Sequence, residues 1–163
     1  MSFTITFFKI VTILLSIVGA SFAIPLAVAF AYGESSVYLV FIIPMIVSFI
    51  LGLAVNLPTR KMKFSMNTRQ TYLIVALSWV VSSLMGTVPL YFSGCFNSFA
   101  DALFESISGI TTTGSTVLSE VESLPRSINM WRCLTHWIGG MGIVTLTVAL
   151  MPLLGVGGFQ LIK

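Results

Sequence analysis

The sequence predicts an all-α integral membrane protein, in which two leading transmembrane helices are followed by a helix–loop–helix unit. Of the 163 residues, 56% are hydrophobic and only 8% are charged, and the mean hydropathy is +1.03. A soluble domain carries far more charge than this. The net charge of +3 comes from basic residues in short connecting segments, as membrane topology requires, so no nucleic-acid partner is indicated.

Four apolar segments are long enough to cross a bilayer, which needs about 20 residues. They are expected at residues 7–31, 37–56, 70–92 and 128–153. Pro25 is expected to kink the first span near its end. Residues 20–23 resemble a signal-peptide cleavage site, but the apolar run continues past them and favours a full span. Residues 1–69 then form two leading helices with a basic loop, and residues 70–163 form the helix–loop–helix unit.

A shorter helix is predicted between the third and fourth spans. Asn97 or Ser98 can cap its start, and Asp101 suits the positive end of the helix dipole. Apolar residues recur at helical spacing over residues 99–110, and Gly109 is predicted to end the helix. Such a helix is far too short to cross a bilayer. A half-length helix is tolerated inside a membrane only where it lines a water-filled path or is buried in protein.

Three threonines and a glycine follow this half-helix: Thr111, Thr112, Thr113 and Gly114. The β-branched threonines favour an extended backbone, and the glycine can adopt dihedral angles that other residues avoid. The negative end of the helix dipole faces this segment, which favours a cation. The backbone carbonyl oxygens of Thr111–Gly114 are therefore predicted to replace part of the hydration shell of an ion.

Basic and acidic residues segregate to opposite sides of the expected spans. Six of the eight basic residues lie near the N-terminus, in the 57–69 loop or at the C-terminus. The five acids lie on the other side: Glu34, Asp101, Glu105, Glu120 and Glu122. The positive-inside rule then places both termini in the cytoplasm. Acids at an external mouth would raise the local cation concentration, although Glu120 and Glu122 are equally well explained as solvated loop charges.

Several polar residues of the last span allow two interpretations. Arg132 can pair with Glu105 or extend its charged group to the membrane surface. His136 is more simply explained as a hydrogen-bonded packing residue than as a functional one. Glycines within 139–142 allow a gate or the close approach of a neighbour. Ser115 with His136 suggests a hydrolase only superficially, because no Gly-x-Ser-x-Gly turn and no orienting acid accompany them, so no enzyme is expected.

Three stretches together resemble a known family. They are FESISGITTTGSTVL at 104–118, LPRSINMWRCLTHWIGGMGIV at 124–144 and LMPLLGVGGFQL at 150–161. They resemble the first pore repeat of the Trk/Ktr/HKT potassium-transporter superfamily, of the bacterial TrkH type. The resemblance implies a helix–pore loop–helix repeat in which Thr111–Gly114 supply one quarter of a four-part selectivity filter, with Gly114 as the key glycine.

The same resemblance implies a function and partners. The function is low-affinity potassium uptake across the cytoplasmic (inner) membrane, with potassium as the transported ion and a cytoplasmic nucleotide-binding regulatory subunit as partner. One quarter of a filter cannot surround an ion, so the 163 residues are expected to be a fragment that works with the remaining pore repeats. The alternatives are a homotetrameric cation channel and a non-conducting membrane interaction subunit.

Overall fold

The computed structural model describes residues 3–60 and 67–150, and within these ranges it contains helices and no strand. The elements are α1 (Phe3–Ser21), α2 (Ala23–Tyr32), η1 (Ser35–Val37), α3 (Tyr38–Asn56), α4 (Thr68–Phe92), α5 (Phe99–Ile110), η2 (Val121–Ser123) and α6 (Arg126–Leu150), where η marks a 3-10 turn. The expected all-α fold is therefore confirmed.

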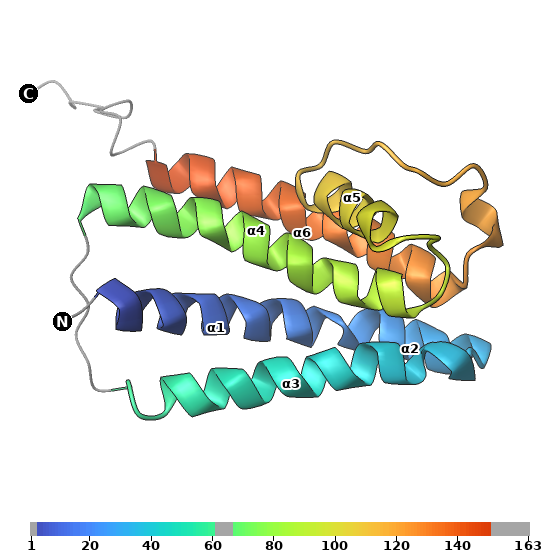
Figure 1. Ribbon diagram of the computed structural model, residues 1–163, viewed down its shortest axis with the longest axis horizontal. Helices are drawn as coiled ribbons and strands as arrows, with labels where there is room; N and C mark the ends of the chain where they lie inside the picture. Colours follow the sequence, from blue (N-terminus) through green and yellow to red (C-terminus); the bar gives the residue numbers. More distant parts are fainter. Residues whose placement is uncertain (1–2, 61–66, 151–163) are drawn as a thin grey trace, which may run out of the picture.

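The long helices lie side by side, and the short helix α5 packs on two of them near one end (Figure 1). Helix α2 continues α1, and α3 runs back along both. The start of α1, the end of α3, the start of α4 and the end of α6 lie at one end of the molecule. The α2–α3 turn and the starts of α5 and α6 lie at the other end, which we call the α5 end.

In the part of the chain that the structure describes, three helical segments are long and apolar enough to cross a membrane. They are Thr4–Tyr32, Ser35–Asn56 and Arg69–Phe92, which match the first three expected spans. The fourth expected span corresponds to α6, which has 25 residues and is not among these three. Its predicted last residues, 151–153, lie outside the described ranges, so its crossing stays a prediction.

The first span is broken one turn before Pro25. Helix α1 ends at Ser21 and α2 begins at Ala23. Proline has no N–H to donate to the carbonyl four residues earlier, and its ring clashes with that carbonyl, here the carbonyl of Ser21. The expected kink is confirmed, and it brings Phe22 into the centre of the molecule, where the Phe22 side chain is fully buried.

Phe22 belongs to an aromatic cluster that joins four helices. Its ring centre lies 6.1 Å from that of Phe41 on α3 and 4.6 Å from that of Trp131 on α6. The Trp131 indole N–H donates to the Gly86 carbonyl on α4, at 2.9 Å. A buried tryptophan needs such an acceptor, and this one fixes α6 against α4.

The interface between α1 and α3 is built from small residues. A Cβ added at Gly19 would come within 1.8 Å of the Ser48 hydroxyl, and one at Gly52 within 2.1 Å of the Ser16 hydroxyl. The two backbones therefore approach each other closely, as in small-residue packing of membrane helices.

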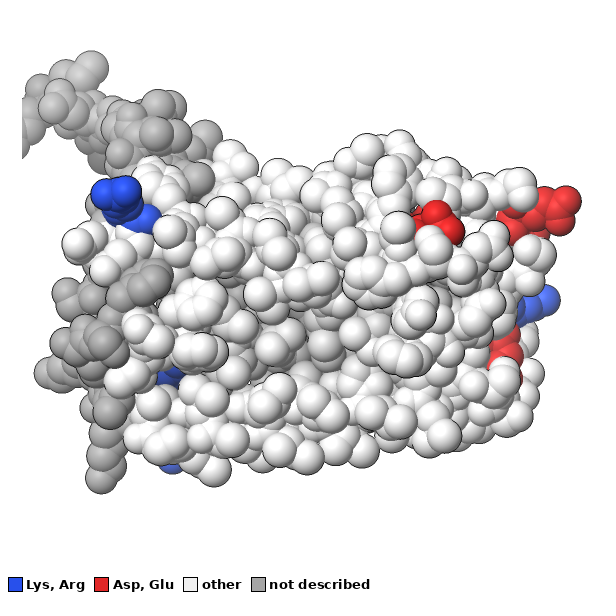
Figure 2. Space-filling model, in the orientation of Figure 1, with Lys and Arg blue, Asp and Glu red and all other residues white. Residues whose placement is uncertain are grey.

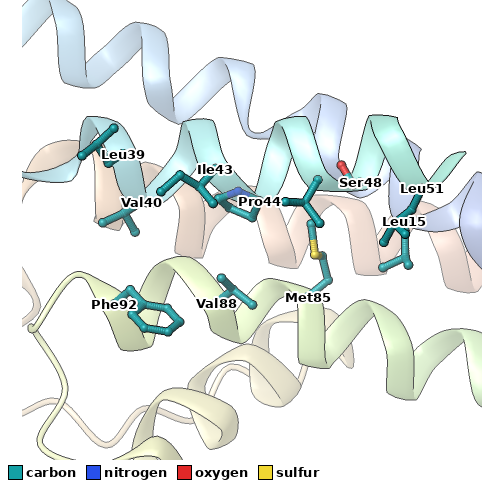
Figure 3. A pocket seen from close by; sticks show the side chains of 11 residues that line it. Leu15, Leu39, Val40, Ile43, Pro44, Ser48, Leu51, Met85, Val88 and Phe92 are labelled. Atoms are coloured by element: carbon teal, nitrogen blue, oxygen red, sulfur yellow. The ribbon is translucent and has the colours of Figure 1, made fainter. Parts of the chain in front are cut away.

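An apolar groove of about 480 Å³ lies between α3 and α4, with one side chain from α1 (Figure 3). Its lining residues are Leu15, Leu39, Val40, Ile43, Pro44, Val47, Ser48, Leu51, Met85, Val88 and Phe92. The lining is almost entirely hydrocarbon, which suits a surface inside a bilayer.

Charged side chains gather at the two ends of the molecule and leave the middle of the visible face uncharged (Figure 2). Acidic groups lie at the α5 end together with one basic group, and the remaining visible basic groups lie at or near the opposite end. The expected segregation of charge is confirmed for the described residues. Which end faces the cytoplasm stays a prediction.

Candidate ion-coordinating site

The start of α5 is fixed by a side-chain cap. The Asp101 N–H donates to the Ser98 hydroxyl oxygen at 3.1 Å, and Asp101 lies in the first turn of the helix. Of the two expected caps, Ser98 is the one used. The helix has 12 residues, as the half-length prediction required.

Helix α5 packs against the middle of α6. Both helices carry a glycine at this contact. A Cβ at Gly109 would come within 2.2 Å of the Thr135 hydroxyl, and one at Gly139 within 2.0 Å of the Ile110 carbonyl oxygen. The prediction that Gly109 ends the helix is therefore wrong. Gly109 is a buried helical residue, because α6 leaves no room for a side chain there.

The actual end of α5 is a Schellman motif closed by a threonine. Thr112 has φ +57°, its N–H donates to the Gly109 carbonyl at 2.9 Å, and the Thr113 N–H donates to the Ser108 carbonyl at 2.9 Å. This left-handed position usually holds glycine. The predicted extended backbone is therefore wrong at Thr111 and Thr112, which form a turn because the last carbonyls of the helix must be paired.

The segment Thr111–Gly114 is exposed, and its carbonyl oxygens accept no hydrogen bond from the described residues. All side chains from Thr111 to Val117 are exposed. Within the described ranges, no N–H or hydroxyl donates to the carbonyl oxygens of Thr111–Gly114. Gly114 has φ +79°, which confirms the expected need for glycine.

The loop after this segment is held by the buried carboxylate of Glu105. The Thr116 hydroxyl and the Val117 N–H both donate to Glu105 Oε2, at 2.9 and 3.2 Å. Arg132 Nε donates to Glu105 Oε1 at 2.7 Å. The side chains of Glu105 and Arg132 are 3% and 11% exposed, so this is a buried ion pair. Of the two interpretations of Arg132, pairing is confirmed.

Glu105 is consequently a buried, paired carboxylate, and whether the other acids lie at an external mouth stays a prediction. The Glu105 carboxylate joins α5, the return loop and α6. The Ser108 hydroxyl adds a second tie, because it donates to the Ser115 carbonyl at 2.6 Å. Two residues of α5, Glu105 and Ser108, thus hold the return loop at residues 115–117.

His136 makes a local contact. Its Nδ1 lies 2.9 Å from the Arg132 carbonyl oxygen on the preceding turn of α6. The structure shows no hydrogen bond between His136 and Ser115 among the described residues. The contact agrees with the packing interpretation of His136.

One long-range contact was not predicted from the sequence. The Arg126 N–H donates to Glu34 Oε1 at 2.7 Å, and the Ser127 N–H donates to Glu34 Oε2 at 3.1 Å. Glu34 stands alone in the short turn between two apolar spans, and a single acid in such a turn was the only available signal. Its partner lies 92 residues further along the chain, beyond the reach of local pattern.

Long apolar helices, with a half-length helix packed on two of them and ending beside the middle of α6, define the class as an all-α membrane protein. Residues 38–163 match the model of the TrkH family, which is described as a cation transport protein. The chain therefore belongs to the TrkH family, and the resemblance seen in its motifs is confirmed.

Named relatives agree with this assignment. The chain is 41% identical to the Trk system potassium uptake protein TrkG of Escherichia coli K12, over 84% of the chain and 28% of the relative. It is 40% identical to the potassium uptake protein TrkH of the same organism, over 95% of the chain and 32% of the relative. An uncharacterized cation transporter of Methanocaldococcus jannaschii is 34% identical over 91% of the chain and 31% of the relative. The chain thus spans about a third of the length of these curated relatives.

Proposed function

We propose that this chain is the first pore repeat, with its leading helices, of a potassium uptake transporter of the cytoplasmic membrane. Residues 1–69 would be the leading helices and residues 70–163 the repeat. The backbone carbonyl oxygens of Thr111–Gly114 form one quarter of the ring that coordinates potassium. Both termini lie in the cytoplasm, and the α5 end faces outward. The names of the relatives, as potassium uptake proteins and not as enzymes, support this function.

One observation carries the proposal: α5 ends beside the middle of α6 in a turn whose carbonyl oxygens accept no hydrogen bond from the part of the chain that the structure describes. Positive φ angles at Thr112 and Gly114 create this turn. Irregular backbone at such a depth in a membrane is tolerated where it lines a water-filled path. Carbonyl oxygens that are free there can take the place of the water around a cation, and the α5 dipole adds partial negative charge.

A complete ring needs three further segments. We propose that they come from the remaining pore repeats of one longer chain, because the relatives are about three times as long as the matched region. A cytoplasmic nucleotide-binding regulatory subunit and low-affinity uptake complete the proposal. A homotetramer of this chain and a non-conducting interaction subunit are the competing assemblies.

Growth of cells that lack potassium uptake tests the function. We expect no rescue at low external potassium by residues 1–163 alone, because three quarters of the coordination shell is missing. A chimaera in which this chain replaces the matching segment of Escherichia coli TrkH, to which it is 40% identical, should restore growth. Rescue by the chain alone would favour the homotetramer. A chimaera that reaches the membrane in normal amounts and still fails to restore growth would contradict the proposal.

A further inference from the structure

Glu34 connects the leading helices to the start of α6. Its carboxylate accepts three hydrogen bonds: from the Arg126 N–H, the Ser127 N–H and the Ser127 hydroxyl. The Arg126 guanidinium lies over the Tyr32 ring, 4.4 Å from its centre. We call these four residues, Tyr32, Glu34, Arg126 and Ser127, the Glu34 clasp.

Helix α6 depends on this distant carboxylate because its own sequence supplies no cap. The first N–H groups of a helix have no partner within the helix. Such groups are normally bonded by a side chain of the residue before the helix, which here is Pro125 and carries no acceptor. In the described residues, Glu34 is the acceptor for the N–H groups of both Arg126 and Ser127.

We propose that Glu34 is a positioning residue for the ion path, which it serves by holding the start of α6. Arg132 lies six residues further along α6, which at helical rise is about 9 Å. Arg132 is the residue that pairs with Glu105, and the other oxygen of Glu105 holds the return loop through Thr116. A shift of the α6 start therefore reaches the loop that carries Thr111–Gly114. The consequence for transport rests on the proposed function, whereas the clasp itself does not.

The charges around the clasp decide its dependence on pH. Arg126 on α6 is the charged group that acts on Glu34, Tyr32 is a titratable neighbour on α2, and η1 contributes no charged side chain. Burial raises the pKa of Glu34, but the bonds from Ser127 and from the Arg126 N–H, with the Arg126 charge, outweigh burial and lower it. A carboxyl with a lowered pKa stabilises the folded contact at neutral pH, and this contribution is lost as pH falls through the lowered value.

Residue-resolved hydrogen exchange of the full chain in detergent tests the clasp. At neutral pH the amides of Arg126 and Ser127 should exchange slowly in the unmodified chain, and Glu34→Ala should speed both by roughly fivefold, as expected for a lost cap. Glu34→Gln keeps one carbonyl oxygen, so it should speed exchange of the two amides less, taken together, than Glu34→Ala does. Glu122→Gln, which changes an exposed acid just before α6, is the matched control and should change neither amide.

A pH series on the unmodified chain needs no variant. After correction for intrinsic exchange, protection of both amides should fall as pH drops below the ordinary carboxyl range, while the Leu134 amide in the body of α6 keeps its protection. Exchange of Arg126 and Ser127 at neutral pH as fast as in Glu34→Ala would overturn the clasp. An equal effect of Glu122→Gln would also overturn it.

Rubidium uptake by the chimaera in proteoliposomes tests the positioning role. Uptake should fall several-fold in Glu34→Ala. With Glu34 present we also expect uptake to fall at acid pH, and this fall should be absent in Glu34→Gln. Exchange as expected with unchanged uptake in Glu34→Ala would overturn positioning while leaving the clasp. A chimaera with Glu34 intact that takes up no rubidium would contradict the proposed function instead, because the exchange result does not depend on transport.

Discussion

The α1–α3 interface and the packing of α5 hold helices together by different means. Between α1 and α3, hydroxyl groups bond mainly within their own helix, as Thr12 does to the Phe8 carbonyl at 2.9 Å and Ser48 to the Met45 carbonyl at 2.8 Å. Around α5 the polar bonds cross between elements. The Ser106 hydroxyl donates to the Ser83 carbonyl on α4 at 2.7 Å, and Glu105 joins α6 and the return loop.

The difference follows from what each region must hold. Two long helices satisfy their own backbone groups, so close van der Waals packing of small residues is enough to join them in a membrane. A 12-residue helix followed by irregular backbone offers only a short surface for packing against its neighbours. Hydrogen bonds and an ion pair to other elements fix α5 in place. A substitution that breaks them should therefore lower the free energy of unfolding more than a substitution between α1 and α3.

The largest effect is expected when the buried ion pair is broken. Arg132→Met leaves the Glu105 carboxylate buried without its cation, which should lower the free energy of unfolding by roughly 3–5 kcal/mol. The measurement is denaturant unfolding of the full chain in detergent micelles. Arg126→Met, on the same helix but exposed, should cost at most about 1 kcal/mol.

A double variant separates loss of the pair from loss of arginine packing. Glu105→Gln combined with Arg132→Met removes the unpaired charge, so it should be more stable than Arg132→Met alone. Equal stability of the single and double variants would show that the carboxylate is not held by the pair.

Glycine substitutions compare the two regions directly. Gly139→Ala places a methyl against the Ile110 carbonyl, which is backbone, and should cost about 1–3 kcal/mol in unfolding free energy. Gly52→Ala meets the Ser16 hydroxyl, a side-chain group that can move more readily than backbone, so it should cost less. Adding Ser16→Ala should relieve the clash and restore part of the stability, because the Ser16 hydrogen bond to the Ser48 carbonyl is then lost. Gly140→Ala is the control, because the nearest atom is 3.9 Å away. A greater loss from Gly52→Ala than from Gly139→Ala would reverse the comparison.

Local pattern was sufficient for the helices. Hydrophobic runs placed the first three spans to within a few residues, and proline chemistry located the kink. The cap at Ser98 and the positive φ of Gly114 also follow from the residue and its neighbours. Each of these features depends on residues close in the sequence, which is why the sequence alone could indicate them.

The remaining features depend on contacts that the sequence does not show. Gly109 looked like a helix end because glycine usually ends helices, whereas it is placed by the approach of Thr135 on α6. Thr112 has the left-handed conformation although β-branched residues avoid it, because the carbonyls at the end of α5 require partners. The bonds of Glu34 to α6 span 92 residues or more.

The most direct test of the account is the ratio of rubidium to sodium uptake by the chimaera when a glycine is changed at the proposed filter. Gly114 and Gly94 have φ +79° and +71°, and a Cβ at either would meet nothing within 4 Å. Serine at either position therefore costs only backbone strain, roughly 1 kcal/mol. If the Thr111–Gly114 carbonyls bind the ion, Gly114→Ser should lower the ratio several-fold and reduce total flux less, while Gly94→Ser leaves the ratio unchanged. An unchanged ratio in Gly114→Ser, or an equal fall in Gly94→Ser, would contradict coordination by these carbonyls.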